Sequence, residues 1–131
     1  SSELSTSKAR GVLPDSVPRA DAVFSMQRSL LLAHAISRGD GPALRGLFED
    51  RLHQPYRLHL APFLPKVIEA AENAGAFGAF LSGAGSTVLA VTDAERAESV
   101  AAAMIEALEA TGAEGHARAL AADNRGARLE G

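Results

Sequence analysis

The 131-residue chain contains no cysteine. Disulfide scaffolds, thiolate metal sites and cysteine nucleophiles all need that residue, so the sequence excludes each of them. No apolar run approaches the roughly 20 residues needed to cross a bilayer, and the first residues do not resemble a signal peptide. We therefore expect a protein of a reducing compartment, most simply the cytoplasm, with no membrane partner.

An excess of charge of one sign is also lacking, because 13 basic residues stand against 16 acidic ones, for a formal net charge of −3. Nonspecific nucleic-acid binding needs a concentrated basic surface, so no nucleic-acid partner is expected. The chain is 47% hydrophobic and 22% charged, which is ordinary for a globular protein and argues against long disorder. Its length suits one domain spanning residues 1–131.

Four histidines are present, and none has the spacing of a metal-ligand pair, so we predict no metal site. Lysine is scarce as well: Lys8 and Lys66 are the only lysines, and the other basic residues are arginines. Arginine offers a planar fork for carboxylate or phosphate, although base composition of the genome produces the same bias.

Hydrophobic spacing in the first part of the chain predicts helices over 5–12, 43–52 and 66–73. Pro18 marks the start of the longest helix, which should end at the glycine-rich stretch 39–42. Between the last two helices, a proline-containing loop over 54–65 should anchor Tyr56 and Phe63 in the core. The longest helix repeats apolar residues at helical spacing, with one histidine: Ala20, Val23, Phe24, Leu30, Leu31 and His34.

After Gly75 the pattern changes to short apolar runs at 77–81 and 87–91, which predict two adjacent strands around a glycine turn. Thr92 and Glu95 have the spacing of a capping box, which should begin a helix that ends at Thr111-Gly112. Two more strands are predicted at 116–122 and 127–129. Helices packed on one face of a small antiparallel sheet make an α+β fold.

The first candidate site is the turn Gly83-Ala84-Gly85-Ser86. Glycines between strands let consecutive backbone amides face an anion such as phosphate. The alternative is a plain hairpin turn. The turn is not a Walker loop, because no Gly-Lys-Ser/Thr follows it.

Two further segments carry polar side chains. Thr6 and Arg10 are four residues apart in the first helix and would share a face, although an N-cap followed by a solvated arginine is the simpler interpretation. In the loop Asp50-Arg51-Leu52-His53-Gln54-Pro55-Tyr56-Arg57, Arg57 could bind a carboxylate through two bonds. His53 could donate a hydrogen bond or accept a proton, although a single histidine more often serves packing or surface polarity.

These segments, in this order, resemble the C-terminal half of homoserine kinases, in the GHMP kinase superfamily. The resemblance covers essentially the whole chain and implies a ferredoxin-like C-terminal domain of that superfamily. The stretches that carry it are Leu4-Ser5-Thr6-Ser7-Lys8-Ala9-Arg10, Leu13-Pro14-Asp15-Ser16-Val17-Pro18, Asp50-Arg51-Leu52-His53-Gln54-Pro55-Tyr56-Arg57 and Ala79-Phe80-Leu81-Ser82-Gly83-Ala84-Gly85-Ser86-Thr87.

The resemblance implies transfer of the γ-phosphate of ATP, with Mg²⁺, to the side-chain hydroxyl of L-homoserine on the route to threonine. It places Arg10 and Arg57 at the substrate's α-carboxylate and Thr6 near the acceptor hydroxyl, as a catalytic residue. We also count His53 among the substrate-binding residues. The loop from Gly83 to Ser86 would lie near the phosphates and support the site more than bind ATP by itself.

The sequence departs from the family pattern in two ways. Ser86 stands where the family usually has proline, and serine keeps an amide donor that proline lacks. The superfamily's main ATP-binding loop and the N-terminal substrate-binding segment have no counterpart here, and the chain opens with serine instead of methionine. We therefore expect a fragment that is inactive alone and needs the N-terminal half as its partner. The resemblance also makes a second copy, in a homodimer, a candidate partner of the whole enzyme.

Two other hypotheses remain open at this point. One is a stand-alone module that binds an amino acid through Arg10 and Arg57 without performing chemistry, because fold does not fix function. The other is a GHMP kinase that phosphorylates a different small alcohol.

Overall fold

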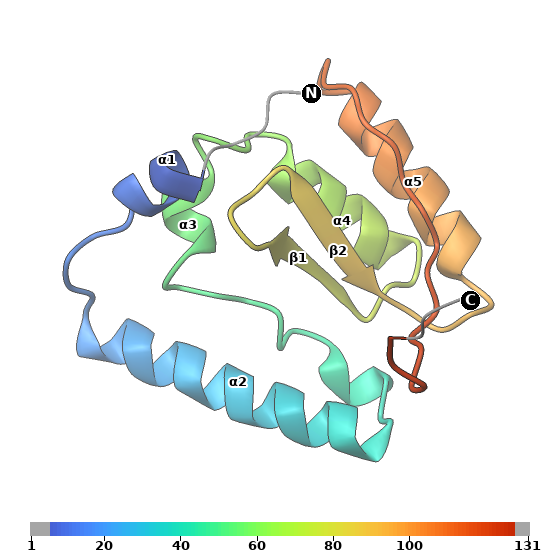
Figure 1. Ribbon diagram of the computed structural model, residues 1–131, viewed down its shortest axis with the longest axis horizontal. Helices are drawn as coiled ribbons and strands as arrows, with labels where there is room; N and C mark the ends of the chain where they lie inside the picture. The colour runs from blue at the N-terminus through green and yellow to red at the C-terminus, as the bar shows by residue number, and fades with distance from the viewer. Residues whose placement is uncertain (1–5, 128–131) are drawn as a thin grey trace.

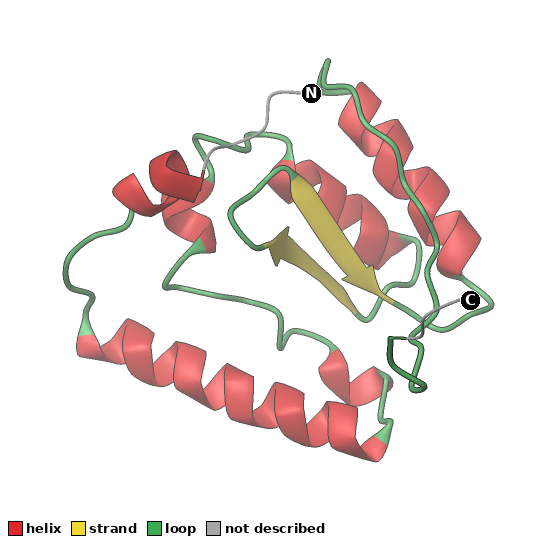
Figure 2. Cartoon of the chain, in the orientation of Figure 1, coloured by secondary structure: helices red, strands yellow, loops and turns green. Residues whose placement is uncertain are grey.

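The computed structural model describes residues 6–127, which form an α+β fold (Figures 1 and 2). Along the chain the elements are α1 (Thr6–Gly11), α2 (Arg19–Arg38), the 3₁₀ helix η1 (Pro42–Leu44), α3 (Gln54–Arg57), α4 (Leu64–Asn73), β1 (Gly78–Ser82), β2 (Thr87–Val91) and α5 (Ala97–Glu109). The predicted fold class is confirmed.

The sheet within the described residues consists of β1 and β2, paired antiparallel from Gly78 opposite Val91 to Ser82 opposite Thr87. Helix α4 lies against this hairpin, and α5 packs beside α4 (Figure 1). The core between them is built largely from small side chains, which let helices and sheet approach closely: Ala71, Ala76, Ala79 and Val100 in one cluster, and Ala61, Leu64 and Leu81 in the next.

Helix α2 lies apart from α4 and α5, along the opposite side of the molecule (Figure 1). It begins after Pro18, as predicted, and ends at Gly39 in the left-handed conformation, with φ of 65°. The segment before α3 holds it: Ser25 Oγ accepts the N–H of Arg51 at 3.3 Å, and the Arg51 guanidinium donates to Asp21 at 3.1 Å. Its predicted apolar stripe faces solvent for the most part, because Val23, Leu30 and Leu31 are exposed.

The predicted helix over 43–52 is wrong. Only η1 is helical there, because Gly46 takes a φ of +72° that a right-handed helix cannot continue. The predicted loop over 54–65 contains the helical turn α3, for reasons given below. Phe63 packs against the second core cluster, as predicted, and Tyr56 is half-buried.

The predicted capping box at Thr92 and Glu95 is also wrong. Asp93 fills that role, since its Oδ1 accepts the N–H of Arg96 at 3.0 Å just before α5. The Thr92 hydroxyl is buried and has no hydrogen-bond partner.

The predicted strand at 116–122 is absent. These residues run as exposed coil, and their alanines offer too little apolar area to hold them against the sheet. Of the predicted strand at 127–129, Ala127 lies in coil, and 128–129 lie outside the described residues, as do Leu4 and Ser5. No helix in the described part of the chain is both long and apolar enough to span a membrane.

Candidate substrate site

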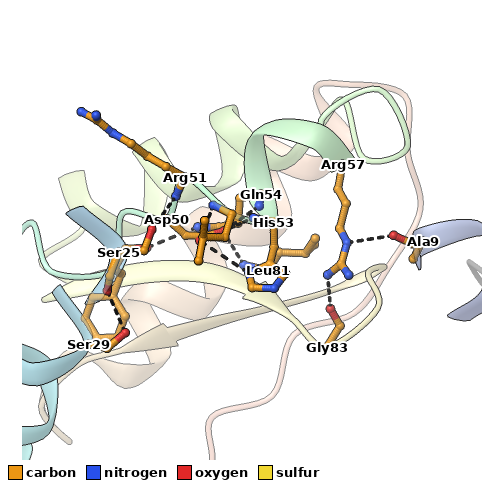
Figure 3. A network of polar contacts seen from close by, with 12 residues as sticks. Ala9, Ser25, Ser29, Asp50, Arg51, His53, Gln54, Arg57, Leu81 and Gly83 are labelled. Atoms are coloured by element: carbon orange, nitrogen blue, oxygen red, sulfur yellow. Dashed lines mark hydrogen bonds and ion pairs between the residues drawn. The ribbon is translucent and has the colours of Figure 1, made fainter. Parts of the chain in front are cut away.

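Arg57, at the end of α3, joins two other segments through its guanidinium group (Figure 3). Its Nε donates to the carbonyl oxygen of Ala9 in α1 at 3.3 Å, and its Nη1 donates to the carbonyl oxygen of Gly83 at 2.8 Å. A guanidinium group carries five N–H donors, so these bonds leave Nη2 without a partner among residues 6–127. The structure thus brings the three polar segments of the sequence together around one cation.

Helix α3 is a single turn, and Asp50 holds its beginning. The Asp50 carboxylate accepts the backbone N–H groups of Leu52, His53 and Gln54 at 2.7–2.8 Å. Burial opposes ionisation of this carboxyl, but the three N–H donors and the nearby His53 outweigh burial and lower its pKa below the ordinary value. Pro55 fits the first turn of a helix, where its missing N–H costs nothing.

Gln54 ties the same turn to the sheet. Its side-chain carbonyl oxygen accepts the N–H of Leu81 in β1 at 2.9 Å, and its amide nitrogen donates to the carbonyl oxygen of Phe48 at 3.3 Å (Figure 3). Leu81 belongs to the buried core. Helix α3, and with it Arg57, is therefore fixed to the end of β1 that enters the glycine loop.

The glycine loop, Gly83 to Ser86, is the connection of the β1–β2 hairpin, as the hairpin interpretation predicts. Gly83, Gly85 and Ser86 have φ of 57°, 126° and 69°. Proline is fixed near −65°, so the loop takes a shape that proline at position 86 would not allow. That shape requires glycine at two positions and costs serine some strain at the third.

The side chains of the other predicted residues form no hydrogen bond with Arg57. Arg10 follows Ala9 in α1 and is exposed; its backbone carbonyl oxygen accepts the N–H of Leu13 at 3.1 Å, and its side chain has no hydrogen bond or ion pair to the described residues. Thr6 lies one turn earlier in the same helix and is exposed too. His53 stands at the start of α3, where its Nδ1 lies 3.5 Å from Asp50 Oδ1. The partner of His53 in the structure is therefore Asp50, in its own segment, and not the glycine loop.

Asp50 and Gln54 belong to the site's framework and were not singled out from the sequence. A signal for Asp50 exists, because an aspartate shortly before a proline is typical of a helix start. Gln54 carries no comparable signal, since its partners are a backbone N–H and a backbone carbonyl oxygen far along the chain.

Two hollows of the described surface lie away from Arg57. One open groove of about 570 Å³ runs along α2 between Arg19 and Gln27, with Arg51 at its side, and another lies near His34 and Leu47. Arg57 lines neither of these two hollows. No three His, Asp or Glu side chains within residues 6–127 gather as a metal site would require.

Comparison with known proteins assigns the chain to a family. Residues 32–110 match the family model described as GHMP kinases C terminal. The chain belongs to the GHMP kinase family. It is 46% identical over 126 residues to a homoserine kinase of Nostoc punctiforme, covering 96% of this chain and 41% of that protein. A homoserine kinase of Desulfitobacterium hafniense is 43% identical, with 96% and 42% covered.

A solved structure agrees with the sequence relatives. The crystal structure of homoserine kinase from Cytophaga hutchinsonii matches this GHMP kinase domain with a TM-score of 0.78 and 29% identity, over 84% of this chain and 35% of that one. The chain thus spans about two-fifths of the length of the curated relatives it matches and corresponds to their C-terminal part.

Proposed function

We propose that this domain forms part of an ATP-dependent homoserine kinase, which transfers the γ-phosphate of ATP to the side-chain hydroxyl of L-homoserine in threonine biosynthesis. The observation that carries the proposal is the position of Arg57, whose guanidinium joins α1 to the glycine loop. Similarity to homoserine kinases over nearly the whole chain supports the choice of substrate.

Arg57 and Arg10 suit the α-carboxylate of the substrate. The two contacts of Arg57 are neutral carbonyl oxygens, so its charge is uncompensated by any carboxylate among the described residues. Its Nη2, which has no partner among residues 6–127, and the guanidinium of Arg10 in α1 would hold the carboxylate in a fixed orientation. Thr6, one turn before Arg10 on α1, would lie near the acceptor hydroxyl.

The domain offers groups that suit the phosphates of ATP but none that suit Mg²⁺ among the described residues. The glycine loop offers backbone N–H groups close to a cation, a combination that suits phosphate oxygens, whereas the described residues supply no cluster of carboxylates for a metal ion. We therefore assign ATP mainly, and Mg²⁺ wholly, to the remainder of the enzyme. Bound there, ATP supplies the phosphoryl group. Phosphoryl transfer depends on positioning and charge neutralisation, and this domain contributes the positioning of homoserine.

The exposed apolar surface of the domain suits contact with the remainder of the enzyme. The chain exposes 9085 Å², whereas a compact monomer of its mass exposes about 6,600 Å². On α2 the side chains of Val23, Met26, Leu30 and Leu31 share a face and are exposed, Leu30 by 71%. We propose that the N-terminal half, which makes up most of each relative, covers this face, and that the complete enzyme works in the cytoplasm.

Replacement of Arg57 by alanine tests the function. In the full-length enzyme that carries this domain, R57A should lower kcat/KM for L-homoserine about 100-fold or more, as expected when a charge-assisted contact to substrate is lost. Binding of ATP should stay unchanged. The matched control is R118A, because Arg118 is an exposed arginine of the C-terminal coil. Unchanged homoserine kinetics in R57A would refute the role of Arg57.

A further inference from the structure

Gln54 and Arg57 stand at the two ends of the single helical turn α3, three residues apart, and both reach the same short stretch of chain. Gln54 contacts Leu81, the penultimate residue of β1, and Arg57 contacts Gly83, two residues later. The turn is therefore attached at both ends to the segment that leads into the glycine loop (Figure 3).

The two attachments differ in kind. Gln54 bonds to the N–H of Leu81 in the buried core and to the carbonyl oxygen of Phe48, whose ring stacks on Phe80 of β1, so both of its partners are attached to β1. The Arg57 guanidinium bonds to α1 and to the loop, which lie outside the buried core clusters, whereas its backbone carbonyl oxygen accepts the N–H groups of Leu60 at 2.9 Å and of Ala61, in the second core cluster, at 3.1 Å. Asp50 and Gln54 hold the amino end of the turn and Ala61 its carboxyl end. Because a turn of four residues has little internal stability of its own, the orientation of the Arg57 side chain depends on Gln54 as well.

We propose that Gln54 is a positioning residue, which holds α3 on β1 so that the Arg57 guanidinium meets both the glycine loop and the substrate's carboxylate. Gln54 touches neither substrate nor cofactor in this role and acts through Arg57. The proposal rests on the proposed function insofar as it takes the carboxylate of homoserine as the ligand of Arg57.

The test compares Q54M and Q54E in the full-length enzyme. Methionine matches the length of glutamine and removes both hydrogen bonds, so KM for homoserine should rise about tenfold, the effect of roughly one net hydrogen bond. KM for ATP should stay within about twofold of the wild type. Glutamate keeps the acceptor for Leu81, so Q54E should recover most of the loss. N124M is the control, because Asn124 is an exposed amide residue of the C-terminal coil.

If the enzyme fails to phosphorylate homoserine, the proposed function is refuted, but the role of Gln54 is not. A second measurement, which does not depend on activity, then tests that role. The Nε–H proton of Arg57, followed by NMR, should exchange slowly with water in the wild type and in Q54E, and at least tenfold faster in Q54M. If Q54M does not fold, a homoserine-selective rise in KM of a few-fold in Q54E still supports the proposal. Equal rises in both KM values, or unchanged Arg57 exchange in folded Q54M, would overturn it.

Discussion

At the scale of single residues, the site depends on side chains that bind backbone atoms. Arg57 was identifiable from the sequence because it ends a polar, proline-containing segment that resembles a known family. Its partners were not, since the carbonyl oxygens of Ala9 and Gly83 exist at every position of any chain and carry no signal. Gln54 carries no signal for the same reason, because it too binds backbone atoms, whereas Asp50 precedes Pro55 at the spacing of a helix start.

Asp50 gives a pH-dependent prediction. Its pKa is lowered in the folded state, so its stabilising effect is present above the unfolded pKa of about 4 and is lost as pH falls through the folded pKa. At pH 7, D50N keeps one acceptor oxygen but loses the charge and the other acceptor, so it should lower the free energy of unfolding by about 1.5 kcal/mol, roughly one charge-assisted hydrogen bond. The gap between D50N and the wild type should shrink below pH 4.

Urea unfolding from pH 7 to pH 3 measures this gap. The control is D15N, because Asp15 is an exposed aspartate outside any helix, and its replacement should change little at either pH. A difference between D50N and the wild type that stays constant down to pH 3 would contradict the assigned state of Asp50.

At the scale of elements, long periodic segments were predictable and their boundaries were less so. The periodicity of 20–34 predicted α2 because a 20-residue helix supplies five turns of pattern. The short elements depended on tertiary contacts. Residues 43–52 have helical composition, yet Gly46 and the carboxylate of Asp50 redirect the chain. The alternating pattern of 116–122 lacks the apolar area that would hold a strand.

The start of α5 provides a prediction that separates the structure from the capping-box hypothesis. D93A removes the acceptor of the Arg96 N–H and should lower the free energy of unfolding by about 1 kcal/mol. T92V replaces a buried, unpartnered hydroxyl by a methyl group of the same shape, so it should be neutral or stabilise by about 1 kcal/mol.

Thermal unfolding of the two variants side by side checks this ordering. A capping box would require the opposite result, in which T92V loses stability and D93A keeps it.

At the scale of the whole molecule, the sequence predicted the fold class and the family, because several motifs recur in the order that the family shows. It did not predict which apolar residues the domain buries. The stripe on α2 has the spacing of a core-facing helix, and its partner is not within residues 6–127. Apolar periodicity predicts that one face of a helix is buried, but it does not predict which element buries that face.

Leu30 tests what covers α2. In the full-length enzyme, L30K should lower the free energy of unfolding by about 2–3 kcal/mol, because a leucine buried against the N-terminal half would be replaced by a charge. L120K is the control, because Leu120 is 76% exposed on the C-terminal coil and should tolerate lysine. Equal stability of the two variants would contradict burial of α2. Loss of a dimer without loss of stability would assign the face to a second copy.

The most direct test of the account is homoserine-dependent release of ADP by the full-length enzyme, with the phosphorylated product identified by ³¹P NMR. The account predicts one O-phosphohomoserine per ADP released, a loss of about 100-fold or more in R57A, and no turnover by residues 1–131 alone. Absence of homoserine-dependent ADP release, or preferential phosphorylation of another small alcohol, would contradict it.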